Sequence, residues 1–312
     1  MRAFAIDSFG EQGSVRDVPA PEPEAGEVLV LVRAAGVNAV DPWVTKGSLK
    51  DMMEHRFPLI PGVEASGVVE QVGDGVAGYA TGDEVYGVSP KPFFGAGTFA
   101  EFATLPSTAI APKPSSVDHA GATALPHTGL TALAAVETVD PKEGSVLLVV
   151  GATGGVGSYL TQLASARGAR VVAVARAENA EYARELGAAE TIDYTKGDLV
   201  ELVRDRYPEG VDALVDFHSD AAGLAKLSAV VRAGGWAVSA SGAVDAEVLA
   251  QRGLQAANIS RADPGRLSEL TGMMDEGRLR IPAISRYPLE RAGEALEEIA
   301  AGHVRGKLVL TI

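Results

Sequence analysis

The fold of this chain is decided by one stretch, Ser145-Val146-Leu147-Leu148-Val149-Val150-Gly151-Ala152-Thr153-Gly154-Gly155-Val156-Gly157. A helix-compatible segment follows to Arg167, and a second apolar run spans residues 170–175. This order predicts strand, glycine turn, helix and strand, the unit that binds a dinucleotide pyrophosphate. Glycines let the backbone approach the phosphates, and the N–H groups at the helix start face the anion. Ala152 stands where G-x-G-x-x-G has its first glycine, and a tight turn without a ligand is the alternative.

Bulk composition narrows the class of protein. At 312 residues and 46% hydrophobic content, the chain is long enough for two domains with real cores. Zero cysteines exclude disulfides, thiolate catalysis and cysteine-ligated metals. The net charge of −14 disfavours nucleic acid as a partner. No apolar stretch reaches the roughly 18 residues of a membrane span, and the N-terminus lacks a signal-peptide core, so we expect a cytoplasmic protein without membrane contact.

The first third of the chain has the pattern of a β domain. Short segments alternate apolar and polar residues, and turns such as Gly73-Asp74-Gly75 separate them. This pattern predicts a partly open β-barrel. The expected strands span residues 27–34, 65–72, 84–88 and 98–104.

From about residue 119, helix and strand patterns alternate, which predicts a doubly wound parallel sheet. The expected elements are a helix over 120–138, strands near 146–150, 170–175, 211–216, 235–240 and 254–260, helices near 264–277 and 289–301, and a strand over 307–311. The apolar strand over 254–260 lies at an expected sheet edge, where unpaired backbone groups invite a symmetric partner. We therefore expect a homodimer.

Short motifs are spread over nearly the whole chain, at residues 36–41, 61–67, 82–85, 97–102, 129–132, 151–157, 186–188 and 306–309. In content and order they resemble those of the medium-chain dehydrogenase/reductase superfamily, and within it the zinc-free quinone oxidoreductase branch. The resemblance implies an α/β protein with a GroES-like catalytic barrel formed by residues 1–118 and 261–312. It also implies a Rossmann domain over 119–260 and an active site in the cleft.

Zinc-dependent relatives need a cysteine, a histidine and a third ligand for an open tetrahedral site. The resemblance places Asp41 at the cysteine position and Val63 at the histidine position, and Glu64 alone cannot hold the metal. The five histidines are scattered without a metal-ligand spacing. We therefore expect no metal and no zinc-dependent alcohol oxidation.

The choice of cofactor is indicated at the end of the second Rossmann strand. NAD enzymes usually place a carboxylate there, whereas this strand runs into Arg176, whose guanidinium suits a 2′-phosphate. A solvated residue at a helix start is the alternative. By resemblance, Tyr194 lies beside the adenosine phosphate. The prediction is NADPH, bound by Thr128, Ala152, Thr153, Gly154, Gly155, Val156, Arg176, Tyr194, Phe217 and Ser241.

By resemblance, Asn38 and Asp41 face the nicotinamide and substrate. We expect Asn38 to donate to a substrate carbonyl and Asp41 to organise a water or a hydroxyl; the alternative is that both only stabilise a turn. Ala39 stands where related enoyl reductases have a tyrosine, which leaves the proton donor open. His127 and His218 are candidates for that role, since imidazole transfers protons near neutral pH.

Two functions from different classes follow. The first is an NADPH-dependent reductase that moves hydride to a quinone or to the C=C bond of an α,β-unsaturated carbonyl. The second is an NADPH-binding protein with little turnover that acts as a structural or partner-binding protein. Both keep the glycine turn, so NADPH consumption with quinones and enones discriminates between them.

Overall fold

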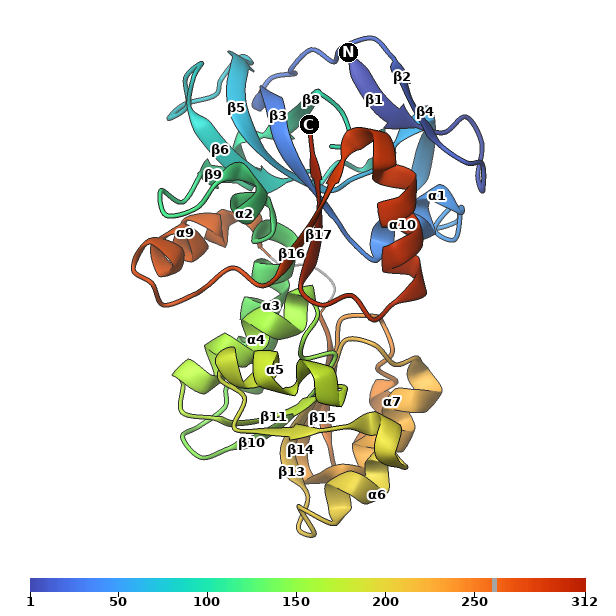
Figure 1. The fold of residues 1–312 in the computed structure, drawn as a ribbon, viewed down its shortest axis with the longest axis vertical. Helices are drawn as coiled ribbons and strands as arrows, with labels where there is room; N and C mark the ends of the chain where they lie inside the picture. The colour runs from blue at the N-terminus through green and yellow to red at the C-terminus, as the bar shows by residue number, and fades with distance from the viewer. Residues whose placement is uncertain (260–262) are drawn as a thin grey trace. The chain divides into compact units, whose positions relative to one another are not determined.

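The structure, a computed structural model, describes residues 1–259 and 263–312. The chain forms two compact units, which Figure 1 shows with their elements labelled. Unit 1 comprises Met1–His127 and Asp263–Ile312, and unit 2 comprises Thr128–Ala262. The boundary expected between residues 260 and 261 lies outside the described residues, as does Ser260, the last residue of the strand expected there.

Unit 2 is built on a six-stranded sheet in the order β12-β11-β10-β13-β14-β15. Every neighbouring pair is parallel, which confirms the predicted doubly wound sheet. The short strand β12 is one that the sequence analysis missed. The strands are β10 (Val146–Val150), β11 (Arg170–Val174), β12 (Glu190–Ile192), β13 (Val211–Asp216), β14 (Val231–Ser239) and β15 (Gln255–Asn258).

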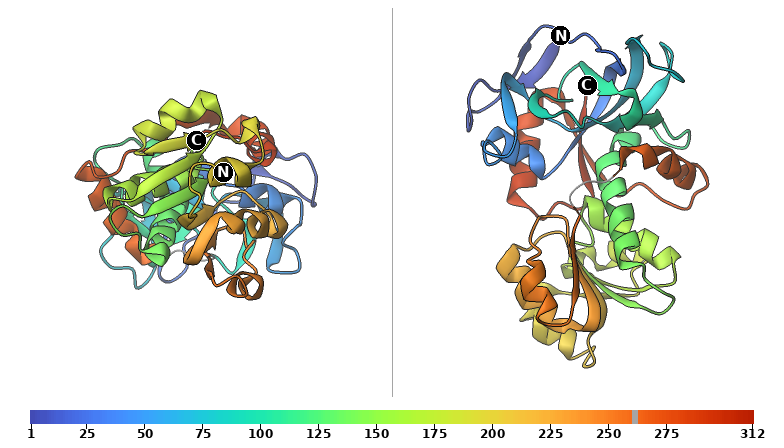
Figure 2. Two further views of the ribbon diagram at one scale, coloured as in Figure 1. Left: turned by 90° about the horizontal axis from the view of Figure 1, so that it is seen from below. Right: turned by 180° about the vertical axis from the view of Figure 1, so that it is seen from behind.

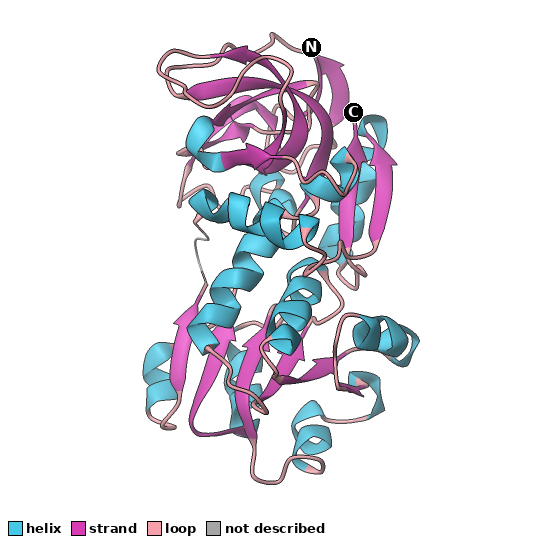
Figure 3. Ribbon diagram, turned by 90° about the vertical axis from the view of Figure 1, so that its left-hand side faces the viewer, coloured by secondary structure: helices cyan, strands magenta, loops and turns pink. Residues whose placement is uncertain are grey.

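Helices cover both faces of this sheet (Figure 3). Successive strand residues point to opposite faces, and one face buries Leu148 and Val150 with Val203 and Leu224 in a single core cluster. The helices of unit 2 are α3 (Pro126–Val139, which starts in unit 1), α4 (Gly155–Ala166), α5 (Ala180–Glu185), α6 (Leu199–Arg204), α7 (Ala221–Leu227) and α8 (Ala246–Ala250), with 3₁₀ turns η2 (Ala177–Asn179), η3 (Tyr194–Lys196) and η4 (Ser228–Val230).

Unit 1 is built on a mostly antiparallel sheet in the order β16-β17-β3-β5-β6-β9, with β8 also paired to β3. The last strand of the chain, β17, pairs antiparallel with β3, so the tail joins the N-terminal sheet. Two further pairs, β1 with β2 and β4 with β7, complete the strands. These are β1 (Arg2–Ala5), β2 (Ser14–Asp17), β3 (Glu27–Val37), β4 (Glu54–Ile60), β5 (Glu64–Val72), β6 (Glu84–Val88), β7 (Phe93–Ala96), β8 (Phe102–Pro106), β9 (Ile110–Pro112), β16 (Ile284–Pro288) and β17 (Lys307–Thr311).

Two elements of unit 1 differ from the sequence prediction. The strand expected over 98–104 begins only at Phe102, because Gly97 and Phe99 donate their backbone N–H groups to the Ile60 and Pro61 carbonyls. Strand β16 was not predicted; it pairs parallel with β17.

The helix expected over 120–138 is two helices, α2 (His119–Thr123) and α3. Pro126 lacks an N–H and restricts the residue before it, so the first helix ends and a new one begins there. Ala120 and Ala124 pack against Ala34 and Val309 in a core cluster of unit 1. Unit 1 therefore extends to His127 instead of ending near residue 118.

The remaining helices of unit 1 lie around its sheet. The view from behind in Figure 2 shows α1 and α9 on opposite sides of this unit. None of the helices in the described part of the chain combines the length and apolar character of a transmembrane segment. They are α1 (Val40–Thr45), α9 (Leu267–Asp275) and α10 (Ala292–Ala301), with 3₁₀ turns η1 (Ser107–Ala109), η5 (Pro264–Arg266) and η6 (Leu289–Arg291).

Candidate active site

The predicted cofactor residues of unit 2 lie where the parallel strands end, on the side of the sheet formed by the carboxyl ends of its strands. Gly151 follows β10, Arg176 follows the end of β11, Phe217 follows β13, and Ser241 follows the end of β14. The strand order reverses between β10 and β13. Ligands of open parallel sheets bind at such a reversal, beyond the carboxyl ends of the strands.

The glycine turn after β10 has the geometry that close approach of a phosphate requires. Gly151 adopts a left-handed conformation with φ 77°, so the tight bend falls on this glycine and not on Ala152. A Cβ atom on Gly157 would lie 2.2 Å from the Gly151 carbonyl oxygen, so α4 can start this near β10 only with glycine there. Gly154 is the N-cap of α4, and its neighbours 153–156 are half-buried. The departure at Ala152 therefore leaves the turn intact.

Arg176 and Tyr194 come together beyond β11. The Arg176 Nε donates to the Tyr194 hydroxyl at 2.9 Å. Tyr194 begins η3, whose N-cap Asp193 accepts from the Thr195 N–H. A half-buried guanidinium held in this way fits a phosphate group, because it offers several N–H donors in one plane.

The loop after β13 bends around a buried carboxylate. Asp216 Oδ1 accepts from the backbone N–H groups of His218 and Ser219 at 2.8 and 2.9 Å. The Ser241 hydroxyl donates to the Ser219 carbonyl at 3.0 Å, which ties the ends of β13 and β14. A Cβ atom on residue 151 would lie 3.6 Å from the Phe217 Cβ, so Phe217 packs next to the glycine turn. Thr128 is buried in the first turn of α3.

The predicted catalytic residues of unit 1 belong to a buried polar cluster that we call the Lys307 cluster: Asn38, Asp41, Glu64, His127 and Lys307. Lys307 Nζ lies 2.6 Å from Glu64 Oε1, and both side chains are buried. The same ammonium donates to Asn38 Oδ1 at 2.5 Å and to the Val37 carbonyl at 3.0 Å. Glu64 Oε2 accepts from the His127 backbone N–H at 2.7 Å.

Asn38 is bound by protein groups at both ends of its amide. Its Nδ2 donates to Glu64 Oε1 at 2.8 Å, while its Oδ1 accepts from Lys307. We expected this amide to polarise a substrate carbonyl. In the structure, its hydrogen bonds go to the two members of the ion pair instead. Asn38 acts here as a group that positions Glu64 and Lys307.

Asp41 is the member of the cluster with an oxygen that lacks a partner. Its Oδ2 accepts from the Asn38 backbone N–H at 2.7 Å, whereas Oδ1 has no hydrogen-bond partner among the described residues. Asp41 lines a cavity of about 30 Å³ together with Gly62, Val63 and Phe94. Burial raises the pKa of Asp41 to about 7, although the Asn38 backbone N–H and Lys307 oppose the rise.

The other titratable members differ in charge preference. Burial opposes ionisation of Glu64, but Lys307 and the other contacts hold the pKa of that carboxyl below its usual value. Burial lowers the pKa of the His127 imidazole, against the attraction of Glu64. The cluster therefore contains one firm ion pair beside a carboxyl and an imidazole that both resist charging.

The Glu64–Lys307 pair was missed by sequence reasoning, although both residues lie in motifs that were singled out. The available signal was a lysine within an apolar strand, Gly306-Lys307-Leu308-Val309, since a buried ammonium requires a carboxylate.

Comparisons with known proteins agree with this architecture. The alcohol dehydrogenase GroES-like domain matches residues 24–115, and the zinc-binding dehydrogenase family matches residues 186–310. The chloroplast envelope quinone oxidoreductase homolog of Arabidopsis thaliana is 30% identical over 99% of this chain and 98% of its own length. The NADPH-dependent alkenal/one oxidoreductase of the same plant is 31% identical over 99% of this chain and 79% of its own length. The quinone oxidoreductase structure from Coxiella burnetii superposes with a TM-score of 0.89 at 30% identity, covering 100% of this chain and 99% of that one.

The chain belongs to the medium-chain dehydrogenase/reductase superfamily, in its quinone oxidoreductase-like branch. Members of this superfamily are oxidoreductases that use a nicotinamide cofactor, and the comparisons support such a cofactor for this chain. The glycine turn, the N-terminus of α4 and the Arg176–Tyr194 pair fit that cofactor.

A catalytic zinc, known in other dehydrogenase/reductases, does not fit the Lys307 cluster. Val63 offers no ligand atom, and both oxygens of Glu64 already accept hydrogen bonds. The Lys307 ammonium beside Glu64 repels a cation. Within residues 1–259 and 263–312, no group of three or more His, Cys, Asp or Glu side chains is arranged so that it could hold a metal ion.

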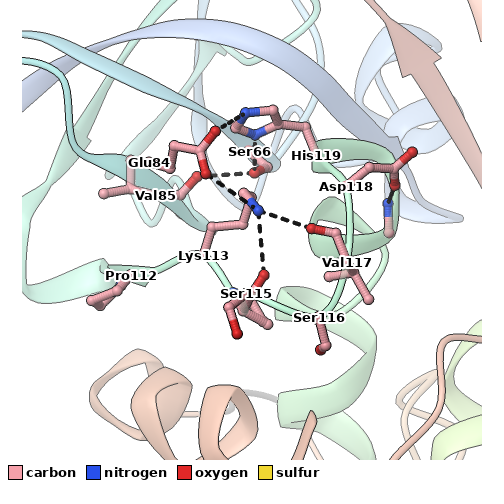
Figure 4. A network of polar contacts seen from close by, with 12 residues as sticks. Ser66, Glu84, Val85, Pro112, Lys113, Ser115, Ser116, Val117, Asp118 and His119 are labelled. Carbon is pink, nitrogen blue, oxygen red and sulfur yellow. Dashed lines mark hydrogen bonds and ion pairs between the residues drawn. The ribbon is translucent and has the colours of Figure 1, made fainter. Parts of the chain in front are cut away.

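A second polar network of unit 1 has the residue types of a nucleophilic triad (Figure 4). His119 Nδ1 lies 2.8 Å from the Ser66 hydroxyl, and its Nε2 lies 3.3 Å from Glu84 Oε1. However, Ser66 is fully buried and donates its own proton to the Val85 carbonyl at 2.9 Å. The network therefore ties α2 to β5 and β6, and it has no accessible nucleophile.

Proposed function

We propose that the protein is an NADPH-dependent oxidoreductase that transfers hydride to a quinone or to the C=C bond of an α,β-unsaturated carbonyl, without a metal. The observation that carries the proposal is the buried Glu64–Lys307 ion pair, next to the positions 41 and 63 that by resemblance correspond to zinc ligands of other dehydrogenases. Alcohol oxidation needs a group that stabilises an alkoxide; the Lys307 ammonium is buried, is neutralised by Glu64 and donates to Asn38 and Val37, so it does not serve that role. Reduction of a conjugated carbonyl develops charge on an oxygen that hydrogen-bond donors alone can stabilise.

Within this proposal, NADPH supplies the hydride when it is bound, and the protein supplies orientation of the two reactants. Arg176 and Tyr194 hold the 2′-phosphate end, and the turn over 151–157 holds the pyrophosphate. Asn38 keeps the ion pair in place. Asp41 organises a water molecule, for which the cavity of about 30 Å³ has room.

The test is NADPH consumption by the purified protein with a panel of quinones, enones and simple alcohols, with and without chelators. We expect turnover of quinones or enones that chelators leave unchanged, and no oxidation of ethanol-type substrates. Loss of turnover with chelators, or a preference for alcohols, contradicts the proposal. Cofactor binding without turnover of any compound favours the alternative of a non-catalytic NADPH-binding protein.

Replacing Arg176 with alanine should raise the dissociation constant for NADPH by about one to two decades, because charge-assisted bonds to the 2′-phosphate are lost. NADH lacks this phosphate, so its dissociation constant should change little. Fluorescence titration of both cofactors measures the difference. Arg170→Ala is the matched control, since Arg170 starts the same strand at its other end and pairs with Glu190. An equal loss for both cofactors would show that Arg176 does not read the 2′-phosphate.

We also propose a homodimer that acts in the cytoplasm. Strand β15 is one of the two edge strands of the six-stranded sheet, and one of its sides is unpaired within the described residues. Antiparallel pairing with a second copy satisfies these backbone groups. Light scattering that reports a monomer at micromolar concentration contradicts the dimer.

A further inference from the structure

The large hydrophobic side chains that the described residues leave exposed gather in one part of unit 1. Phe9 is 37% exposed, Trp43 46%, Met52 80% and Phe57 41%. Phe9 lies in the turn between β1 and β2, and the other three come from α1, β4 and the turns between them. A Cβ on Gly47 would meet the Phe9 ring at 2.7 Å, so this turn packs against the 43–57 segment. Exposed apolar groups gathered in this way mark a binding surface.

Ring contacts lead from this exposed surface into the interior. Phe57 and Phe9 meet edge to face with ring centroids 5.1 Å apart, and Phe9 meets His55 in the same way at 5.0 Å. His55 then packs on Phe94 at 5.1 Å. We call Phe9, His55, Phe57 and Phe94 the aromatic strip.

The inner end of the aromatic strip reaches the candidate active site. Phe94 lines the same cavity of about 30 Å³ as Asp41. It also packs against Ile6, Val44 and Leu59, which fixes its ring. The strip therefore connects the exposed face of unit 1 to the carboxyl group with the unpartnered oxygen.

The surroundings of the strip suit an uncharged ligand. The Arg56 guanidinium lies 3.6 Å from the Phe93 ring centroid, and Glu54 neutralises it through bonds of 2.8 and 3.3 Å. His55 Nδ1 lies 2.9 Å from the Met53 carbonyl, to which it donates, whereas the buried Nε2 of the same ring has no hydrogen-bond partner among the described residues. Met52 and Met53 add flexible thioether side chains, which adapt to apolar ligands of varied shape.

We propose that the aromatic strip binds the apolar tail of the substrate, an extended aliphatic or aromatic substituent on a quinone or enone whose carbonyl end lies toward Asp41. This inference rests on the proposed reductase function for the identity of the ligand. It assigns the substrate class as long, uncharged and apolar beyond the conjugated carbonyl.

The first experiment measures kcat/KM for straight-chain alkenones that differ only in the number of methylenes beyond the carbonyl. Full burial of a methylene increases affinity roughly fourfold. Because a tail on the aromatic strip is exposed to solvent on one side, we expect kcat/KM to rise by about two- to threefold per added methylene. The double variant Phe9→Ser, Phe57→Ser should bring the factor close to one. Met273→Ser is the control, because this half-buried residue lies on α9 on the other side of unit 1 (Figure 2).

The second experiment needs no turnover. Saturated ketones of the same chain lengths are titrated into the Trp236→Phe variant, and the fluorescence of Trp43 is measured. Trp43 is then the one remaining tryptophan of the two in the chain. Affinity should rise with chain length in this background and lose that rise in the double variant. This result without any NADPH consumption overturns the proposed function and supports the tail site.

Two results overturn the tail site. One is an equal chain-length factor in the wild type and in the double variant, with melting temperatures that show both to be folded. The other is cosedimentation of the wild type with phosphatidylcholine vesicles that the double variant loses while its chain-length factor is unchanged. The latter assigns the strip to a membrane surface instead of a substrate.

Discussion

Replacing Lys307 with methionine should lower the free energy of unfolding by about 3–5 kcal/mol, since it leaves a buried carboxylate without its partner. Glu64 is fully buried, and its Oε1 lies 2.6 Å from the Lys307 ammonium. The remaining donors to Glu64 are the Asn38 amide and the His127 N–H, which are neutral groups. They cannot replace the lost attraction between opposite charges. Urea unfolding at neutral pH measures the loss.

The matched control is the double variant Glu64→Gln, Lys307→Met. Both charges are removed together, and the introduced glutamine side chain keeps an oxygen for the His127 N–H. Replacing a buried ion pair by neutral groups of similar volume is often close to neutral in stability. We therefore expect the double variant to recover most of the loss. Equal destabilisation of both variants would show that packing of the lysine stem, and not charge pairing, holds the site.

The loss in Lys307→Met should depend on pH in a defined direction. In the wild type, the pKa of Glu64 lies below its usual 4.5, so this carboxylate stabilises the fold above that pH. Without Lys307, burial dominates and raises the pKa of Glu64. The variant is then penalised most where Glu64 must ionise, so the deficit should grow as the pH rises above about 4.5 and shrink below it.

Local patterns were sufficient to predict the strands and the glycine turn at the carboxyl ends of the parallel sheet. The turn at Gly151 and the strand before it lie within a few residues of one another, and Arg176 follows the next strand. Hydrophobic periodicity and glycine spacing report such short-range features, and the parallel sheet then brings the strand ends together. The glycine spacing does not predict that the tight bend falls on Gly151 instead of on Ala152, because φ at Gly151 is a property of the folded turn.

The Lys307 cluster could be predicted only in part, because it is assembled by long-range strand pairing. Asn38 follows β3, Glu64 begins β5 and Lys307 begins β17, and the antiparallel register of β17 on β3 brings Lys307 to the end of β3. No local pattern fixes that register. The sequence motifs predicted Asn38 and Asp41 as site residues, which stays a prediction, but they could not show that Lys307 donates to the Asn38 side-chain oxygen.

Replacing Asp41 with asparagine should change the pH dependence of stability by roughly 4 kcal/mol between pH 4 and pH 8. The wild-type carboxyl has a pKa of about 7 in the fold, against 3.8 for the ordinary value, because it is buried. The folded state thus holds a proton that the unfolded chain releases. This contribution to stability is fully present below about 3.8 and is lost as the pH rises through about 7. Glu64, Lys307 and Lys91 are the charged groups that face the same carboxyl or its cavity.

Asparagine has the same shape, accepts the Asn38 N–H through its oxygen and does not titrate. The stability of Asp41→Asn relative to the wild type should therefore increase as the pH rises from 4 to 8, as measured by urea unfolding at each pH. Asp118→Asn is the control of opposite sign. The Gly121 N–H and Arg286 hold the pKa of Asp118 below its usual value, so that variant loses stability relative to the wild type as the pH rises through the acid range. A relative stability of Asp41→Asn that stays flat or falls with pH would show that Asp41 is ionised in the fold. In that case it could not serve as the neutral acid that orders water beside Gly62 and Phe94.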